Sequence, residues 1–287
     1  MTMKNGHFNV GRYLVGGKVV IGCPQGDNVD VVCESDELPR ILEAGAGSAI
    51  RRVASAEARL LPPLDRASRV FAVAVNYREH GAEAKTLPPV RPIIFYKAPS
   101  NFVAHGEVLN PNKKMTAKFD YEGEIAVVIG RECKDASLET ALDHVAGICA
   151  LDDGSARDLT RVSLGPPGPE AKTWPDWTAA KGLDGASALG PTISCGPDIV
   201  AALRARTLRI STRLNGEVVQ DESMAEMVFS TEELIVALSS YMTLLPGDVI
   251  ATGTPAGVGS ARNRFLASGD ELQVQVSGLD PLCVKVG

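Results

Sequence analysis

Two glutamates at alternate positions stand at the start of an apolar segment, and this pattern restricts the local fold more than any other feature of the chain. Glu122 and Glu124 lie in Asp120-Tyr121-Glu122-Gly123-Glu124, which leads into the apolar residues 125–129. The apolar run predicts a β-strand, and residues two apart on a strand face the same side. Neighbouring carboxylates beside an apolar strand repel each other and lose hydration unless a cation compensates them. The pattern therefore predicts either a cation site or an acidic pair that faces water.

A third carboxylate follows a second apolar run. Asp153 comes shortly after Ala146–Leu151, and we expect a neighbouring strand to bring it to the two glutamates. Three carboxylates, with water and substrate in the remaining positions, suit Mg²⁺ or Mn²⁺; Ca²⁺ is also allowed, whereas Zn²⁺ prefers His and Cys. The alternative is a solvated strand edge followed by an acidic loop that binds no metal. Spacing alone leaves both interpretations open.

Five motifs then occur in order along the chain. They are Asn76–His80, Asp120–Glu124, Asp153–Asp158, Lys181–Asp184 and Thr252–Gly259. In this order they resemble the fumarylacetoacetate hydrolase family, over residues 65 to 287. The resemblance implies an α+β fold, namely a mixed β-sandwich roll with a small N-terminal domain, and an Mg²⁺ or Mn²⁺ site at Glu122, Glu124 and Asp153. It also implies a homodimer that acts on a small oxo-acid.

A histidine and a glutamate on a short polar helix form a candidate acid-base pair. His80 and Glu83 are three residues apart, so both lie on one helical face, where the carboxylate would raise the basicity of the imidazole. Without the resemblance, a solvent-facing pair explains them equally well. In shorter members of the resembled family the equivalent residues activate water on a mobile lid. Gly81 weakens such a helix by about 1 kcal/mol relative to Ala. We therefore expect residues 77–89 to be poorly ordered or displaced from the metal site without ligand, and to close when an oxo-acid binds the ion.

Four further residues receive roles through the resemblance. Lys181 matches the lysine of a Gly-Lys-x-x-Asp segment, although Ala180 replaces the glycine, and would stabilise an oxyanion or enolate. Thr254 would offer its hydroxyl to a substrate carboxylate. Arg157 is a candidate substrate-binding residue, although the resemblance gives it chiefly the role of a brace for the metal loop. Tyr77, like Tyr96, is a candidate for the pocket lining. The alternatives are a surface lysine, a turn threonine and a tyrosine that only packs in the core.

Three departures from the family pattern weaken any transfer of substrate identity. Asp152 replaces the usual asparagine and adds a negative charge beside the site. Thr160 stands where a glutamine is frequent, so an amide that commonly contacts substrate is lost. The segment Ser163–Trp177 is longer and richer in proline than expected and contains both tryptophans, Trp174 and Trp177. We expect this segment to reshape one wall of the pocket.

Composition sets wider limits. The 287 residues are 45% hydrophobic and 22% charged, which is enough for one large domain or for a large and a small one. The net charge of −6, without a Lys/Arg cluster, argues against a nucleic-acid partner. No apolar run reaches the roughly 18 residues that span a bilayer, and the first residues lack a signal-peptide core, so we expect a cytoplasmic protein without a membrane partner. The six scattered cysteines are interpreted as ordinary thiols.

The pattern of elements suggests two parts, residues 1–64 and residues 65–287. In the first part, Gly16-Gly17 predicts a hairpin turn, residues 37–43 a short helix, and the prolines in Leu60–Leu64 an extended linker. In the second part, short strands outnumber helices. They are expected at residues 70–75, 93–96, 125–129, 146–151, 208–214, 249–252 and 272–276, with a helix at 232–244. The alternation of a Rossmann sheet is missing, and Thr254–Gly259 does not begin a helix, so a phosphate loop is rejected.

Three functional hypotheses follow. The first is a metal-dependent hydrolase that cleaves a C–C bond in a 1,3-dicarbonyl or acylpyruvate, with water activated by His80 and Glu83 and the enolate stabilised by Lys181. The second is an isomerase or decarboxylase of a 2-oxo or 2-hydroxydienoic acid at the same site. The third is a non-catalytic metabolite-binding protein, which the loss of a metal ligand or of His80 would have favoured. None of these residues is lost.

Overall fold

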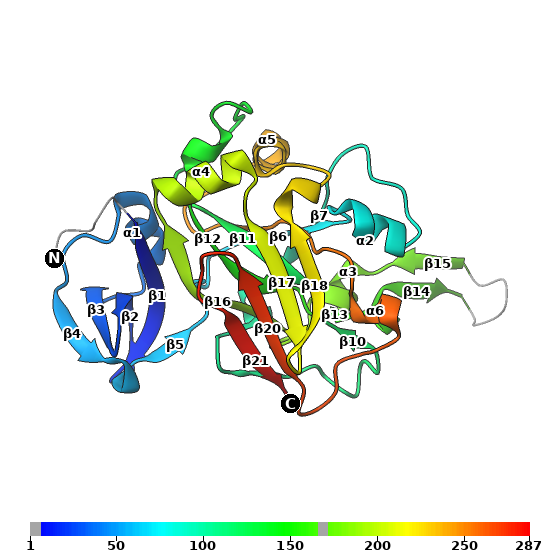
Figure 1. Cartoon of the computed structure of the whole chain (residues 1–287), viewed down its shortest axis with the longest axis horizontal. Coiled ribbons are helices and arrows are strands. Elements are labelled where there is room, and N and C mark those ends of the chain that lie inside the picture. Colours follow the sequence, from blue (N-terminus) through cyan, green and yellow to red (C-terminus); the bar gives the residue numbers. More distant parts are fainter. Residues whose placement is uncertain (1–6, 166–171) are drawn as a thin grey trace.

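The computed structural model describes residues 7–165 and 172–287. Its largest sheet has twelve strands, most of them antiparallel (Figure 1). Along the main path of this sheet the strands follow one another in the order β4 (Arg51–Ala54), β3 (Asn28–Cys33), β2 (Lys18–Gln25), β1 (Phe8–Val15), β16 (Ser187–Cys195), β12 (Val145–Asp152), β11 (Gly123–Ile129), β19 (Val249–Ala251), β6 (Val70–Ala74) and β7 (Ile93–Lys97). Two short strands join from the side, β5 (Arg59–Leu61) on β1 and β8 (Phe102–Val103) on β16.

A second sheet packs face to face on β11, β12 and β16. Its strands are β18 (Glu217–Ser223), β17 (Arg209–Leu214), β20 (Glu271–Val276), β21 (Leu282–Val286) and β9 (Val108–Leu109). Two small antiparallel pairs complete the strands, β10 (Phe119–Asp120) with β13 (Ser155–Ala156) and β14 (Arg161–Leu164) with β15 (Lys172–Pro175). The helices are α1 (Leu38–Ala44), α2 (Arg78–Glu83), α3 (Trp177–Lys181), α4 (Pro197–Ala205), α5 (Thr231–Tyr241) and α6 (Gly259–Arg262).

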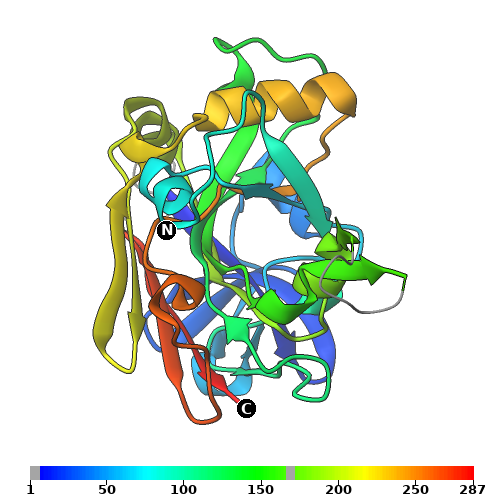
Figure 2. The ribbon, with the colours of Figure 1, turned by 90° about the vertical axis from the view of Figure 1, so that its right-hand side faces the viewer.

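Strand β11 is buried on both faces, and its alternating side chains enter two different cores. Ile125, Val127 and Ile129 pack in the core between the two sheets. Ala126 and Val128 pack on the opposite face of the large sheet, in a second core around which the strands curve (Figure 2). Any side chain on the even-numbered face of this segment therefore points toward the second core.

Most of the predicted elements are present, and the α+β roll is confirmed. The Gly16-Gly17 turn joins β1 to β2 with positive φ at both residues, which is the conformation that a tight hairpin turn requires. The predicted linker Leu60–Leu64 is partly wrong, because its first residues form β5 and pair with β1. Extended backbone was predicted correctly there, but its hydrogen-bond partner is distant in sequence.

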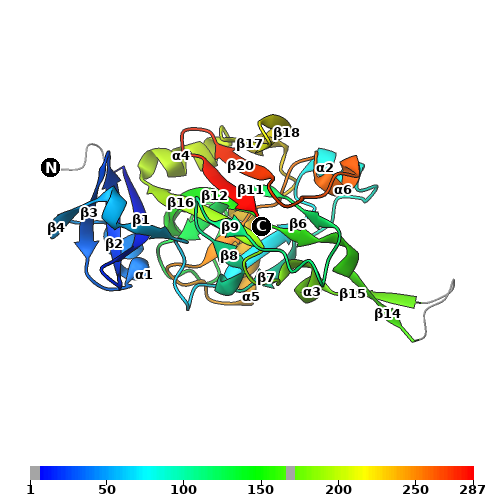
Figure 3. The ribbon, with the colours of Figure 1, turned by 90° about the horizontal axis from the view of Figure 1, so that it is seen from below.

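The N-terminal strands belong to the same sheet as the rest of the chain. Phe8, Asn9 and Val10 of β1 pair with β16. The N-terminal strands lie at one end of the molecule and the β14–β15 hairpin projects from the other (Figure 3). Part of the proline-rich segment that we expected to reshape the pocket, residues 166–171, lies outside the described residues. In the described ranges, no helix combines the length and the apolar character needed to cross a membrane.

Candidate active site

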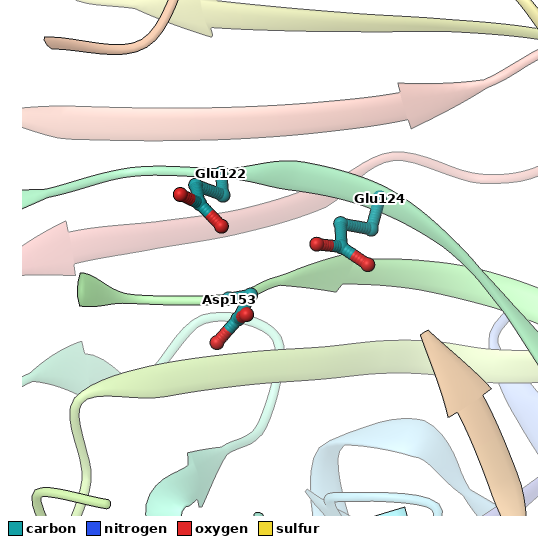
Figure 4. Close-up of side chains that lie close together, drawn as sticks. All are labelled: Glu122, Glu124 and Asp153. Atoms are coloured by element: carbon teal, nitrogen blue, oxygen red, sulfur yellow. The ribbon is translucent and has the colours of Figure 1, made fainter. Parts of the chain in front are cut away.

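Three buried carboxylates converge at the end of β11 and β12. Glu122 and Glu124 lie on the face of the segment that carries Ala126 and Val128, so they point toward the second core. Asp153 follows β12 and meets them from the neighbouring strand (Figure 4). Each residue offers an oxygen atom, and these atoms all lie within 4.8 Å of one another. The three side chains can therefore hold one metal ion.

Backbone pairing explains why the carboxylates meet. Gly123 lies opposite Asp152 in the β11–β12 register, and the Asp153 N–H donates to the Glu122 carbonyl at 2.8 Å. Asp152 Oδ1 accepts a hydrogen bond from the Glu122 N–H at 2.9 Å. Gly123 faces the other sheet, where an added Cβ would lie 2.0 Å from Thr212 Oγ1. Glycine between the two glutamates therefore lets the sheets close behind the site.

Three cationic side chains surround the carboxylates. Lys181 Nζ lies 2.6 Å from Glu122 Oε2 and 2.8 Å from Asp153 Oδ2. Arg157 contacts Glu122 Oε1 at 2.6 Å through Nη2 and Asp120 Oδ2 at 2.7 Å through Nε. The predicted positions of Lys181 and Arg157 beside the carboxylates are thus observed, with both side chains already engaged by the site itself.

Sequence reasoning missed the third cation, Lys97. Its Nζ lies 2.7 Å from Asp153 Oδ1, and it also donates to the Lys181 carbonyl. Lys97 closes β7 and is buried, like Phe95 two residues earlier. A lysine on the buried face of an apolar strand was the available signal, because a buried ammonium requires an acidic partner.

The buried site contains more carboxylates than cationic side chains. Five carboxylates are buried together, from Asp120, Glu122, Glu124, Asp152 and Asp153. Within residues 7–165 and 172–287, three cations pair with them, Lys97, Lys181 and Arg157, so full ionisation leaves two negative charges in excess (five minus three). Burial at such a density is unfavourable unless further positive charge or protons are supplied.

The directions of the pKa shifts indicate which carboxylates are least stable in their charged form. Burial, with the charges of Asp153 and Glu122, raises the pKa of Glu124 well above its usual range, and burial raises the pKa of Asp152 to about 8. Burial would also raise the pKa of Glu122, but Lys181 and Arg157 outweigh it and lower the value. Glu124 accepts a hydrogen bond from the Gly253 N–H at 2.7 Å, and in the described part of the chain no cationic side chain pairs with it. A divalent cation at Glu124 would supply the two missing positive charges, so the donor set fits such an ion.

The predicted acid-base pair lies in the same cavity. His80 and Glu83 line a cavity of about 360 Å³ together with Glu122 and Asp153. His80 Nδ1 is 3.6 Å from Glu83 Oε2, which is an electrostatic contact too long for a hydrogen bond. Glu83 instead accepts hydrogen bonds from the Gly257 N–H at 3.0 and 3.1 Å.

The contact between Glu83 and Gly257 also corrects the expected position of the lid. Residues 77–89 were expected to be poorly ordered or displaced from the metal site without ligand. Helix α2 instead lies against the cavity, where Glu83 accepts hydrogen bonds from Gly257, while closure on ligand binding stays a prediction. Gly257 has φ +102°, and an added Cβ would lie 1.9 Å from the Val219 carbonyl oxygen. The loop can therefore present its N–H to Glu83 only with glycine at this position.

Two of the predicted substrate contacts differ from expectation. Thr254 lines the cavity, but its hydroxyl donates to the Gly123 carbonyl at 2.9 Å and accepts from Gln220 Nε2 at 2.8 Å. Tyr77 does not line the cavity: it is buried in the core between the sheets, so its predicted role as a pocket residue is wrong. Trp177, the last residue of the segment that was expected to reshape one wall of the pocket, lines the cavity.

A comparison with known protein families supports the resemblance that the sequence motifs indicated. Residues 69–287 match the family described as fumarylacetoacetate (FAA) hydrolase C-terminal. The chain belongs to the fumarylacetoacetate hydrolase family. Its similarity to individual relatives extends beyond the matched domain.

Several relatives are named oxaloacetate tautomerases, of which two illustrate the similarity. The chain is 36% identical over 238 residues to the oxaloacetate tautomerase YisK of Bacillus subtilis, covering 80% of this chain and 74% of that protein. It is also 36% identical over 262 residues to the mitochondrial oxaloacetate tautomerase FAHD2A of Homo sapiens, covering 87% and 79%.

Solved structures of the family cover nearly the whole chain. The fumarylacetoacetate hydrolase of Exiguobacterium antarcticum superposes with a TM-score of 0.79 at 29% identity, covering 97% of this chain and 99% of that one. The 2-hydroxyhepta-2,4-diene-1,7-dioate isomerase of Mycobacterium marinum gives 0.75 at 28% identity, covering 97% and 98%. The described N-terminal strands are therefore part of an arrangement that these proteins share.

Proposed function

We propose that this protein is a divalent-metal-dependent tautomerase or isomerase that moves a proton next to the carbonyl of a small 2-oxo acid. The observation that carries the proposal is the position of His80 in the same cavity as a buried carboxylate cluster that lacks two positive charges. The names of the relatives support this activity, which was the second hypothesis from the sequence, better than C–C bond hydrolysis.

Glu122, Glu124 and Asp153 would hold Mg²⁺ or Mn²⁺, with Ca²⁺ as the weaker candidate. When bound, such an ion would bind the 2-oxo carboxylate and act as a Lewis acid toward the carbonyl. The residues of the chain then supply the proton transfer. A ring nitrogen of His80 takes the C3 proton as the C2=C3 bond forms and the carbonyl electron pair moves to oxygen. The imidazolium of His80 then returns a proton to that oxygen, directly or through solvent, which gives the enol and regenerates the neutral base.

The other residues stabilise charge during this transfer. Glu83 lies close enough to stabilise the imidazolium of His80 but remains fixed by Gly257. Lys181 lines the cavity and is held by Glu122 and Asp153, so its positive charge is fixed before the enolate forms. This arrangement requires one base and no nucleophilic water.

Hydrolysis of an acylpyruvate remains the second candidate, because a His80–Glu83 pair can also activate water. A panel of oxaloacetate, 2-hydroxydienoates and acylpyruvates, assayed with Mg²⁺ and Mn²⁺, separates the two activities. We expect the protein to accelerate keto–enol exchange of oxaloacetate or double-bond migration in 2-hydroxydienoates. We expect it not to cleave the C–C bond of acylpyruvates at a comparable rate. His80→Asn should lower kcat by about 10²-fold.

Three other outcomes have defined meanings. Release of pyruvate from acylpyruvates faster than oxaloacetate tautomerisation would support the hydrolase, and release of CO₂ from oxaloacetate would support the decarboxylase. Binding of these acids without turnover would favour the non-catalytic hypothesis.

A further inference from the structure

We infer that the cavity selects a 2-oxo acid with a single carboxylate and an apolar or aromatic substituent, which lies along Phe95 and Trp177. The inference rests on the proposed function, because it concerns the substrate of the same site. It differs from what the relatives' names would suggest, since oxaloacetate carries a second carboxylate in place of an apolar group.

An aromatic wall leads outward from the charged end of the cavity. The Phe95 ring centroid lies 5.5 Å from Lys181 Nζ, which itself contacts Glu122 and Asp153. Trp177 stacks on Phe95 with 5.0 Å between ring centroids and 15° between planes. Exposure increases along this series, from 4% for Lys181 to 9% for Phe95 and 41% for Trp177. A ligand bound at the carboxylates therefore reaches solvent along aromatic surface.

The local sequence fixes this wall to the charged site. Trp177 and Lys181 are four residues apart on α3, so they lie on the same helical face, and both line the cavity. Asp176 caps the helix by accepting from the Ala179 N–H at 2.9 Å. The position of the Trp177 ring is thus coupled to that of the Lys181 ammonium.

Charge in the cavity disfavours a second carboxylate. Apart from His80, its described lining contains two cations, Lys181 and Arg157. Arg157 already pairs with Asp120 and Glu122, and Lys181 with Glu122 and Asp153. Glu83 adds another carboxylate to the same lining. A dicarboxylate would compete for Arg157 and lose hydration against an apolar wall, whereas a phenyl or alkyl group would be stabilised there.

Binding of ligands that cannot enolise tests the inference independently of catalysis. Benzoylformate and oxamate share the chelating head, but only benzoylformate carries an aromatic ring. With the Mn²⁺-loaded protein, Trp177→Ala should raise the Kd of benzoylformate about 10-fold or more and change that of oxamate less than about 2-fold. Trp177→Phe should restore most of the affinity.

Trp174→Ala is the matched control, because Trp174 lies on strand β15 three residues before Trp177, is 66% exposed and does not line the cavity. It should leave both Kd values unchanged. Equal effects of Trp177→Ala on both ligands, or none on benzoylformate, would overturn the inference.

Turnover gives the second arm of the test. Phenylpyruvate should be tautomerised with a higher kcat/KM than oxaloacetate, and Trp177→Ala should lower only the value for phenylpyruvate. A preference for oxaloacetate that is indifferent to Trp177 would contradict the inferred specificity. If neither acid is tautomerised but benzoylformate binding depends on Trp177, the proposed reaction fails while the aromatic binding wall is retained.

Discussion

Glu122 and Glu124 are neighbours on one strand face, yet their surroundings differ. Glu122 contacts Lys181 and Arg157, so its charged form is stabilised despite burial. Glu124 receives a single backbone N–H from Gly253, and its pKa is raised by burial and by the adjacent carboxylates. The first glutamate is thus balanced by the protein, whereas the second depends on a bound ion or a proton.

Lys97 provides a test of this charge balance at a single residue. Replacing it by Met removes a cation that lies 2.7 Å from the buried Asp153 carboxylate. Asp153 would then keep Lys181 but lose half of its cationic pairing in a buried site. We therefore expect a loss of about 3 kcal/mol in the free energy of unfolding, measured with urea in the presence of a chelator. Lys134→Met is the control, because Lys134 pairs with Asp135 at the surface and should change the value by less than about 0.5 kcal/mol. Similar values for both variants would refute the assigned role of Lys97.

At the level of elements, alternation along β11 predicted which face the two glutamates share, because the period of two follows from strand geometry alone. Local sequence patterns did not predict strand β16, which pairs with β1 and β12, or helix α4. Their partners are distant in sequence, so no local pattern specifies them. Lys97 was missed for the same reason: its partner Asp153 follows a strand that is distant in sequence, β12. Tyr77 was misassigned because a tyrosine at the start of helix α2 can enter either the cavity or the core.

Gly123 gives a prediction for the packing of the two sheets. A Cβ at this position would lie 2.0 Å from Thr212 Oγ1 and 3.3 Å from Val274 Cγ1. Gly123→Ala should therefore destabilise the protein by about 1–3 kcal/mol in urea unfolding. Thr212→Ala removes the clashing oxygen, a hydroxyl for which the described part of the chain offers no hydrogen-bond partner. Adding this change should recover part of the loss, and a Gly123→Ala variant as stable as the native chain would show that the sheets are not in close contact there.

At the level of the whole molecule, one sheet runs from the N-terminal strands to β7, next to the candidate site. The matched family domain begins at residue 69, so the separation of residues 1–64 as a small domain remains a prediction. The homodimer implied by the family also remains a prediction.

Sedimentation velocity tests the assembly. The chain has a mass of 30.3 kDa, and we expect one species of about twice that mass at micromolar concentration. Addition of a chelator should leave this species intact if the metal serves the active site alone. A monomer at all concentrations would exclude the homodimer.

The most direct test of the proposed metal-dependent proton transfer is calorimetric titration of Mn²⁺ into the metal-free protein and into Glu124→Gln, with oxo-acid tautomerisation measured on the same samples. Glutamine keeps the shape of Glu124 and removes its charge, so the fold should persist. We expect one ion per native chain, affinity reduced by about 10²-fold or more in Glu124→Gln, and activity that disappears with chelator and returns with metal. Equal Mn²⁺ affinity in the two proteins, or tautomerisation that survives full removal of metal, would contradict the assignment of this carboxylate cluster as the catalytic metal site.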